Sequence, residues 1–319
     1  MSKISIAVHG GAGTILKEDM TFELERDYRA GLQLALDIGF SILENGGSST
    51  AAVKAAVVVL EDNPLFNAGK GAVFTNAGIH ELDAAIMNGA TLGAGAVAGV
   101  QMVRNPIELA EAIMLHSGHV FLSGQGALDF ALARGLATEC KDYFYNQFRY
   151  DQWLEVRDSD DYNLDHYRQN SFEAKKEKKL GTVGAVACDK DRNISAATST
   201  GGMTNKRYGR IGDTPLIGSG TYANNETCAI SCTGHGELFI RSVAAYDISC
   251  LMEYKKLSLQ EACEEVVLRK LVKIDGEGGV IGMDAQGNAA LVFNTKGMYR
   301  GTRNSDGDNM VAIYKDINS

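Results

Sequence analysis

Thr182 has the features of a catalytic residue, because it lies in Leu180-Gly181-Thr182-Val183-Gly184, between a charged segment and an apolar run. A peptide bond that follows an exposed arm can be cut without disturbing the core. Cleavage before Thr182 would leave an amino-terminal threonine, which is a complete catalytic unit. Its hydroxyl is a nucleophile, and its α-amine, with a pKa of about 7.7–8.0, is a base near neutral pH.

The charged segment before Thr182 is the main support for the hypothesis that the chain is cut at this position. Residues 155–180 contain several aspartates and then Lys175-Lys176-Glu177-Lys178-Lys179, and we expect them to be mobile and exposed. The Gly-Thr dipeptide alone proves nothing. It also occurs at Gly13-Thr14, Gly220-Thr221 and Gly301-Thr302. The simpler interpretation is that Thr182 is a β-branched residue at the start of a strand.

The elements that would position Thr182 are predicted from apolar patterning. Two runs of small residues around the turn 189–193 indicate a hairpin that begins at Thr182 and ends at Thr200. A second hairpin is expected around Asn88-Gly89, which suits a two-residue turn, and a third across 280–294. Strands of this kind imply antiparallel sheets.

Helices and a first strand complete the predicted elements. Residues 4–8 form a short apolar run suited to a buried strand that stops at His9-Gly10-Gly11-Ala12-Gly13. Ser258 and Glu261 form a capping box. Helices are predicted over 22–43, 49–60, 106–116, 123–133, 237–254 and 258–272. Because each half of the chain has too few elements for its own core, one shared sandwich is favoured over two domains.

Composition excludes several classes of protein. Lysine and arginine number 31 against 40 acidic residues, which gives a net charge of −9 and no basic surface for nucleic acid. The 6 cysteines lack the spacing of a zinc site or a disulfide scaffold. Because no apolar run is long enough for a signal peptide or a membrane span, we expect a cytoplasmic protein. The 36 glycines, against 3 prolines, indicate many permissive backbone positions.

Several motifs occur together in one order along the chain. They are His9-Gly10-Gly11-Ala12-Gly13, Leu65-Phe66-Asn67-Ala68-Gly69, Gly181-Thr182-Val183-Gly184-Ala185-Val186, Thr198-Ser199-Thr200-Gly201-Gly202, Asn205-Lys206, Gly209-Arg210-Ile211-Gly212-Asp213 and Thr233-Gly234-His235-Gly236-Glu237. With these motifs the sequence resembles the plant-type L-asparaginases and isoaspartyl dipeptidases (β-aspartyl peptidases), a family of N-terminal-nucleophile (Ntn) hydrolases. The resemblance spans nearly the whole chain.

The resemblance implies a fold and a maturation pathway. The expected fold is α+β, a four-layer αββα sandwich with antiparallel sheets between helix layers. Residues 1–319 would form a single domain that cuts itself before Thr182, giving an α subunit of residues 1–181, with 155–181 as a mobile linker, and a β subunit of residues 182–319. The resemblance also suggests a dimer of such heterodimers.

The resemblance further implies which residues act on the substrate, L-asparagine or a β-aspartyl dipeptide. Thr182 would be the nucleophile, and Thr200 would orient it. Thr233 and Gly234 would donate hydrogen bonds to the oxyanion. Three residues would hold the aspartyl head group: Arg210 on its α-carboxylate, Asp213 on its α-ammonium, and Gly236. The simpler interpretations are a half-buried strand threonine for Thr200 and a surface salt bridge between Arg210 and Asp213.

Supporting residues are expected around this site. Asn67 would buttress Thr182, and Gly10 and Gly11 would flank it, whereas His235 is not required as a base because the terminal amine is available. No cofactor is expected for catalysis. The resemblance implies a structural sodium ion, which main-chain carbonyls suit as ligands. These carbonyls belong to Leu60, Glu61, Asn63, Phe66, Ala68 and Lys70.

Other functions remain open on the sequence alone. A glycosylasparaginase is the nearest enzymatic alternative, because leaving-group preference depends on loop shapes. A nucleotide-binding module is suggested by the strand before Gly10-Gly11-Ala12-Gly13, but the spacing of these glycines does not match a phosphate loop and no Walker lysine follows. A catalytically silent relative is disfavoured because the threonines, Arg210 and Asp213 are all present. Gly276, Gly278 and Gly279 have no functional interpretation.

Overall fold

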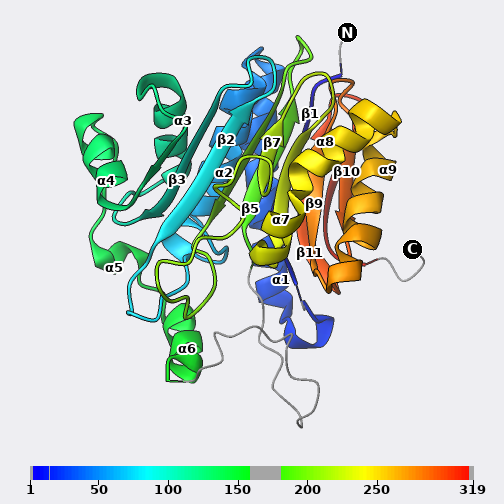
Figure 1. Cartoon of the computed structure of the whole chain (residues 1–319). Coiled ribbons are helices and arrows are strands. Elements are labelled where there is room, and N and C mark those ends of the chain that lie inside the picture. The colour runs from blue at the N-terminus through cyan, green and yellow to red at the C-terminus, as the bar shows by residue number, and fades with distance from the viewer. Residues whose placement is uncertain (1–2, 14, 159–180, 316–319) are drawn as a thin grey trace.

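Two β-sheets lie face to face in the computed structural model, which describes residues 3–13, 15–158 and 181–315. The larger sheet has eight strands. Their spatial order is β12 (Asn309–Tyr314), β11 (Gly297–Asn304), β1 (Ser5–Gly13), β5 (Val183–Cys188), β6 (Ile194–Thr200), β2 (Leu82–Asn88), β3 (Ala94–Val100) and β4 (Phe121–Ser123). Neighbouring strands are antiparallel except for the short pair β3 and β4 (Figure 1).

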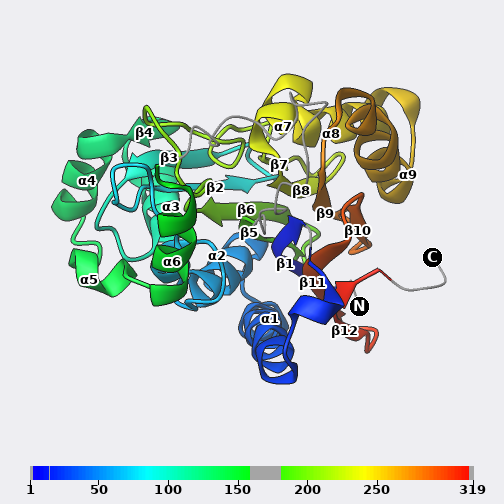
Figure 2. The ribbon, with the colours of Figure 1, turned by 90° about the horizontal axis from the view of Figure 1, so that it is seen from below.

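The smaller sheet has four antiparallel strands. Their order is β10 (Ala289–Phe293), β9 (Gly278–Met283), β8 (Ala229–Gly234) and β7 (Thr221–Ala223). Helices cover the outer face of each sheet, so four layers are seen from below (Figure 2). The expected αββα sandwich is therefore confirmed. Over the larger sheet lie α1 (Phe22–Glu44), α2 (Ser49–Glu61) and α3 (Pro106–His116), and over the smaller one α7 (Gly236–Ser242), α8 (Ala244–Lys255) and α9 (Leu259–Glu264).

Side-chain alternation along the strands explains the layers. In β1, Ile6 and Val8 pack toward α1 and α2, whereas Ala7 between them faces the other sheet. Successive residues of a strand point to opposite faces, so a strand buried on both sides has no polar face. Small residues such as Ala196 and Ala229 fill much of the layer between the sheets.

Most of the predicted helices are confirmed, and their caps explain where they start. The Thr21 side chain accepts a hydrogen bond from Leu24 N at the start of α1, and Ser48 does the same for α2. The capping box of Ser258 and Glu261 is present. Asn105 directly precedes α3, but its side chain makes no capping bond.

Several local predictions were wrong. Strand β1 does not stop at His9 but continues through Gly13, with a register shift between His9 and Gly11. The hairpin of β2 and β3 is real, but its connection runs from Gly89 to Gly93, so Asn88-Gly89 is not a two-residue turn. The helix expected over 237–254 is divided into α7 and α8 at Val243, which has a φ of +48°.

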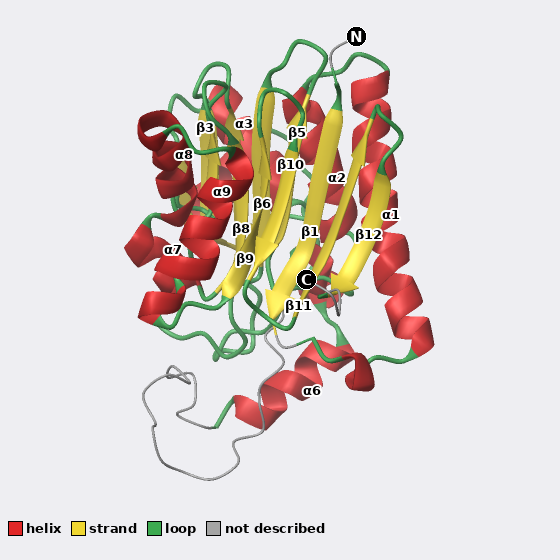
Figure 3. Cartoon of the chain, turned by 90° about the vertical axis from the view of Figure 1, so that its right-hand side faces the viewer, coloured by secondary structure: helices red, strands yellow, loops and turns green. Residues whose placement is uncertain are grey.

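A short helical arm lies at one end of the sandwich. Helices α4 (Gly124–Ala133) and α5 (Lys141–Phe144) lead to α6 (Gln147–Val156), which projects at the lower end in Figures 1 and 3. The predicted linker began at residue 155, but Glu155 and Val156 belong to α6, and a turn continues to Asp158. Residues 159–180 lie outside the described part of the chain.

The two halves of the chain share the larger sheet. Strand β1 lies between β11 and β5, and β6 pairs with β2, so early and late segments alternate. Gly10, Gly11 and Gly13 therefore belong to a central strand, not to a phosphate-binding loop before a helix, and the nucleotide-binding alternative fails on this point. Among the described residues, no helix has the length and apolar character that a membrane span requires.

Candidate active site

Thr182 directly precedes β5, a central strand of the larger sheet. Val183 is paired with Ser199 in the antiparallel register, so one step further along Thr182 lies opposite Thr200, the last residue of β6. Both threonines are buried, with exposed fractions of 8% and 3%. The sheet therefore brings together the two threonines that the sequence assigned to the nucleophile and its orienting partner.

Gly181, the residue before Thr182, is packed against β1. A Cβ placed on Gly11 would lie 2.7 Å from Cα of Gly181, and Gly11 has a φ of +119°. A side chain is therefore excluded at Gly11 both by space and by backbone conformation. A Cβ on Gly181 would lie 2.8 Å from Oγ1 of Thr233. The peptide bond between Gly181 and Thr182 thus lies beside Gly11 and the Thr233 hydroxyl.

Thr233 has a hydroxyl proton available for donation. The Ala12 amide donates to its Oγ1 over 3.2 Å, which occupies the oxygen as an acceptor, and no described residue accepts the proton of this hydroxyl. Thr233 is fully buried near the end of β8, and Gly234 follows it opposite Gly278 of β9. Gly278, which has no interpretation from sequence, packs closely against Gly234, since a Cβ on Gly234 would lie 2.6 Å from Cα of Gly278.

Asn67 braces the backbone that follows Thr200. Its side-chain nitrogen Nδ2 donates to Gly202 O over 2.8 Å, and its main-chain carbonyl accepts from Gly201 N over 3.2 Å. The Gly202 amide in turn donates to Thr200 Oγ1 over 3.0 Å. These contacts connect Asn67 to Thr200. Gly10 lies on the opposite side of β1 from the site, because a Cβ there would meet the Phe66 ring.

Arg210 and Asp213 converge on Gly236, as the predicted head-group site requires. A Cβ on Gly236 would lie 2.8 Å from Nη2 of Arg210 and 2.9 Å from Oδ1 of Asp213. The ion pair of Arg210 is formed with Glu237, through Nε to Oε1 and Nη2 to Oε2, both 2.8 Å. A surface salt bridge between Arg210 and Asp213 is therefore the wrong interpretation. The Glu237 carboxylate binds the side of the guanidinium, and Nη1 is left for another acceptor.

Asp213 is buried and chemically unusual. Burial raises the pKa of its carboxyl group to about 7, while Arg210 lowers this pKa in part and Glu237 and Asp83 raise it. Its Oδ2 has no hydrogen-bond partner among the described residues. A buried carboxylate oxygen without a donor suits a ligand with an ammonium group. The neighbouring Glu237 also contacts His235, whose Nε2 lies 3.6 Å from Glu237 Oε2.

Comparison with known proteins identifies this arrangement. Residues 2–313 match the family model described as asparaginase. The chain belongs to the asparaginase family. It is 52% identical over 300 residues to an isoaspartyl peptidase of Salmonella typhimurium, with 94% of this chain and 95% of that one covered. It is likewise 52% identical to an isoaspartyl peptidase of Escherichia coli, covering 94% and 92%.

A plant-type L-asparaginase of Pyrococcus furiosus is 42% identical over 302 residues, with 92% of this chain and 94% of that one covered. These similarities extend over whole chains. The asparaginase-family chain described here is therefore an enzyme, a hydrolase with the layered Ntn-hydrolase fold.

A chain of buried polar side chains, which no sequence pattern indicates, links the two sheets of this asparaginase-family fold. His9 Nε2 lies 2.8 Å from Ser231 Oγ, which lies 2.7 Å from Thr198 Oγ1. Thr221 donates from its hydroxyl to Thr198 Oγ1 over 2.6 Å. Burial lowers the pKa of His9 to about 3, so the imidazole is neutral. The hydroxyl chain therefore fixes β1, β6, β7 and β8 relative to one another without a buried charge.

The last residues of α2 and the loop that follows it carry the carbonyls of the predicted sodium site. The backbone at Leu60, Glu61 and Ala68 is buried, and neutral carbonyl oxygens are ligands that suit a hard alkali cation. The carbonyls of Phe66 and Ala68 accept local hydrogen bonds of 2.9 and 3.0 Å, which leaves each a second lone pair. The donor chemistry therefore fits the ion. The described residues hold no cluster of histidine, cysteine or carboxylate ligands for another metal.

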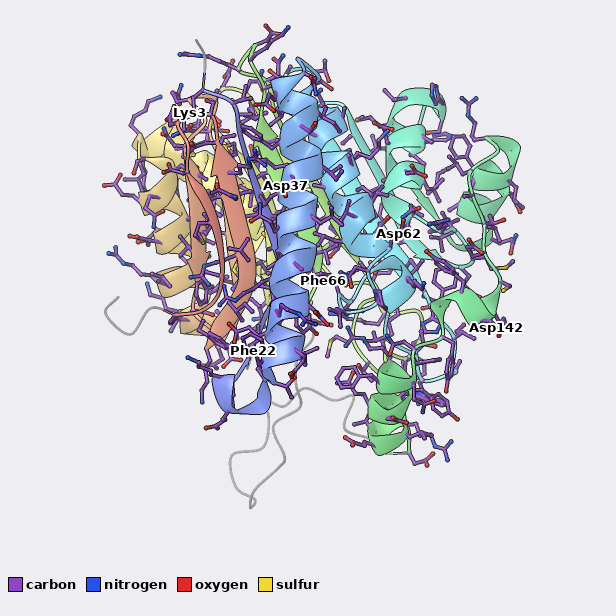
Figure 4. The ribbon with its side chains drawn as sticks, turned by 180° about the vertical axis from the view of Figure 1, so that it is seen from behind. Lys3, Phe22, Asp37, Asp62, Phe66 and Asp142 are labelled. Atoms are coloured by element: carbon purple, nitrogen blue, oxygen red, sulfur yellow. The ribbon has the colours of Figure 1, made fainter. Side chains whose placement is uncertain are left out.

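Arg149 holds this loop from the α6 side. It is 1% exposed, and it donates from Nε to Gly71 O over 3.0 Å and from Nη2 to Leu65 O over 3.1 Å. Burial lowers the pKa of Arg149 to about 10, so the guanidinium stays charged at neutral pH. Phe66, in the same loop, packs edge-on against Tyr28 of α1 with ring centroids 5.4 Å apart (Figure 4).

Two residues that shape the site received no role from the sequence. Glu237 stands in the quoted motif after Gly236, so a signal was present, but only the fold shows that its partner is Arg210. Glu61 was considered only for its carbonyl, yet its Oε1 accepts from Ile107 N over 3.0 Å and caps α3 in place of Asn105. Burial raises the pKa of Glu61 to about 8.

Proposed function

We propose that the chain is an amidohydrolase that activates itself by autoproteolysis and cleaves β-aspartyl dipeptides and L-asparagine. Thr182 is its amino-terminal nucleophile, and a β-aspartyl ester of Thr182 is the intermediate. Relatives named isoaspartyl peptidase, at 52% identity over nearly the whole chain, support this substrate class. Thr233, Gly234, Arg210, Asp213 and Gly236 serve the roles that the sequence motifs assign to them.

The observation that carries the proposal is the environment of the bond between Gly181 and Thr182. This bond lies at the buried end of β5, between Gly11 and the Thr233 hydroxyl, and Thr182 lies opposite Thr200. A strand threonine without a catalytic role needs neither a glycine in front of it nor a hydroxyl donor beside the preceding residue. The same donor can serve cleavage of the chain and cleavage of the substrate.

Activation follows as an acyl shift. The Thr182 hydroxyl attacks the carbonyl carbon of Gly181, and the C–N bond breaks as the amide nitrogen becomes the Thr182 amine. The Gly181 acyl group is then an ester of Thr182 Oγ1, and water hydrolyses this ester to free the Gly181 carboxylate. Positioned donors at the developing oxyanion lower the barrier to such steps.

Turnover uses the amine released by activation. The amine accepts the Thr182 hydroxyl proton, and Oγ1 attacks the side-chain carbonyl of asparagine or the isopeptide carbonyl of a β-aspartyl dipeptide. The Thr233 hydroxyl and the Gly234 amide stabilise the oxyanion. Ammonia or an amino acid leaves with the proton, and water then releases aspartate. Arg210 holds the α-carboxylate and Asp213 holds the α-ammonium. With the head group held in this way, the reacting carbonyl is positioned for attack by Thr182 Oγ1.

The decisive experiment compares the unmodified protein with Thr182→Ala and Thr182→Ser. We expect mass spectrometry to find a new amino terminus at Thr182 in the unmodified protein and a single uncut chain in Thr182→Ala. Turnover of L-asparagine, β-aspartyl-leucine and a glycosylated asparagine then gives the substrate preference, with β-aspartyl-leucine favoured. Thr182→Ser retains a hydroxyl and should cleave, more slowly. An uncut, active parent protein would overturn the proposal, and preference for the glycosylated substrate would assign the glycosylasparaginase alternative.

We also propose a structural sodium ion in the loop from Leu60 to Lys70, held by the six carbonyls predicted from sequence. An ion bound only to the folded state stabilises it, so replacement of Na⁺ by choline at constant ionic strength should lower the melting temperature. Equal melting temperatures in the two salts would contradict the ion. The proposal assigns it no part in the reaction.

Finally, we propose that residues 1–319 remain one folded unit after cleavage and that two such units form a dimer. The supporting observation is the shared sheet, in which segments from both sides of Thr182 alternate. Light scattering during size-exclusion chromatography gives the mass in solution, and a mass equal to that of one chain would exclude the dimer.

A further inference from the structure

The segment that carries Arg210 and Asp213 has an unusual backbone. Four residues between 202 and 209 have positive φ angles, namely Gly202 at +82°, Asn205 at +64°, Tyr208 at +58° and Gly209 at +66°. Left-handed conformations at non-glycine residues are unfavourable and persist where surrounding contacts hold them. One side of this segment, residues 206–209, borders a hollow of about 270 Å³ instead of packed core. The segment therefore depends on a few specific contacts for its shape.

Asn205 makes several of these contacts, and it is 1% exposed. Its amide nitrogen Nδ2 donates to Val156 O over 2.8 Å, and its Oδ1 accepts from Asn76 Nδ2 over 2.8 Å. Its backbone N–H donates to Phe74 O over 2.8 Å. Asn76 adds a second link, because its backbone N–H donates to Lys206 O over 2.9 Å.

Val156 is the last residue of α6, and the carbonyls of a helix's last turn are the ones that side chains from other segments can cap. Asn205 therefore caps the carboxyl end of α6 from a distant segment. Helix α6 is itself held in place by contacts with the segment before β2. Trp153 stacks on Phe74 with ring centroids 5.8 Å apart, and the buried Arg149 binds two carbonyls of the loop before β2.

We propose that Asn205 is a positioning residue, which ties the head-group segment to the end of α6 and thereby fixes Arg210 and Asp213. This inference rests on the proposed function, in which those two side chains bind the substrate. Under that proposal α6 belongs to the first fragment and Asn205 to the second, so the bond from Asn205 to Val156 joins the cleaved pieces next to the site. The first fragment thus contributes to substrate binding through α6.

Two substitutions distinguish the contribution of the Asn205 side-chain hydrogen bonds from that of its left-handed backbone. Asn205→Gly keeps the left-handed conformation but removes both side-chain bonds of Asn205. Asn76→Ala removes the bonds of Asn76 Nδ2 to Asn205 Oδ1 and to Arg157 O, and leaves Asn205 on Val156. Asn45→Ala, in an exposed residue that follows α1, is the matched control. Each protein is tested for cleavage by mass spectrometry, for kcat and KM with β-aspartyl-leucine, and for affinity toward L-aspartate by calorimetry.

We expect Asn205→Gly to cleave fully, to keep kcat within about twofold, and to raise KM and the Kd of L-aspartate about tenfold, since two hydrogen bonds that preorganise the site are lost. Asn76→Ala should give a smaller increase, and Asn45→Ala none. Unchanged KM and Kd in both variants would overturn the role of Asn205. So would a loss of kcat and cleavage without a change in affinity, which is the effect of a residue that only stabilises the fold. Absence of cleavage and turnover in the unmodified protein would instead contradict the proposed function.

Discussion

Asp213 places a carboxylate with a raised pKa where the proposed substrate carries its ammonium. Below pH 7 this group is protonated, because burial raises its pKa to about 7, and a neutral acid binds an ammonium weakly. We therefore expect KM for β-aspartyl-leucine to fall as the pH rises through 7. KM measured between about pH 5.5 and 8.5 tests this expectation. A KM that does not change with pH would contradict this expectation. A pH dependence that persists in Asp213→Asn would assign the titration to another group.

The same pKa has a consequence for stability. A carboxyl group whose pKa is higher in the folded than in the unfolded state stabilises the fold at low pH, and this contribution is lost as the pH rises through the folded pKa. Asp213→Asn cannot ionise, so it should raise the melting temperature at pH 8 and have less effect at pH 5. Thermal unfolding at the two pH values measures the difference. A melting temperature that falls equally at both would show that hydrogen bonding of Asp213 dominates.

Glu237 holds Arg210 by its side, through two bonds of 2.8 Å, and so determines which edge of the guanidinium meets the substrate. Glu237→Gln keeps the shape but loses the charge. We expect KM to rise about five- to tenfold with kcat nearly unchanged, because a charge-assisted bond is weakened without contact to the reacting atoms. Glu265→Gln, in an exposed pair with Arg269, is the control. A fall in kcat alone would place Glu237 in the chemical step.

Helix α6 stabilises the loop before β2 through one buried cation. Arg149 binds the carbonyls of Gly71 and Leu65, so Arg149→Ala leaves a cavity and the Gly71 carbonyl without this donor. We expect the free energy of unfolding to fall by about 2–4 kcal/mol, as for other losses of buried networks. Denaturant titration measures the change, with the exposed Arg134→Ala as the reference. Equal midpoints in the two variants would show that the loop does not need α6.

Elements with a clear amphipathic period or a cap were predictable, whereas several central strands were not. The periods and caps of α1 and α2 lie within a single stretch of sequence, and both helices are found where expected. Strand β8, Ala-Ile-Ser-Cys-Thr-Gly, has small residues because layers cover both of its faces, and it lacks the alternation that identifies a half-exposed strand. Glycines within β1 were interpreted as a break for the same reason.

The candidate site shows the same division. Motif residues could be assigned from their resemblance to a family, but their partners lie far away in sequence. His9 and Ser231 are separated by 222 positions, and the pair Arg210 and Glu237 by 27. No local spacing encodes such contacts, since they depend on how the two sheets stack. Asn205 likewise has its partner on α6, a helix that the sequence did not predict.

At the scale of the molecule, the larger sheet joins the two proposed fragments at three places. Strand β1 pairs with β11 and β5, and β2 pairs with β6. We therefore expect cleaved protein to elute as one species in native size-exclusion chromatography and to unfold in a single transition, with two bands appearing only in denaturing gels. Separation of the fragments without denaturant would mean that these strand pairs contribute little.

The pairing of β1 with β11 also determines when the enzyme can exist. Ser5 lies opposite Asn304, so β1 pairs with a strand that the ribosome makes well after Thr182. Until then β1 has an open edge, and the sheet that presents Thr182 lacks one side. Under the proposed function, a nascent chain therefore keeps Thr182 within an uncut backbone, and we expect cleavage only after β11 has been made and paired with β1. Chains that terminate before β11 are expected to stay uncut, so truncated products would have no peptidase activity.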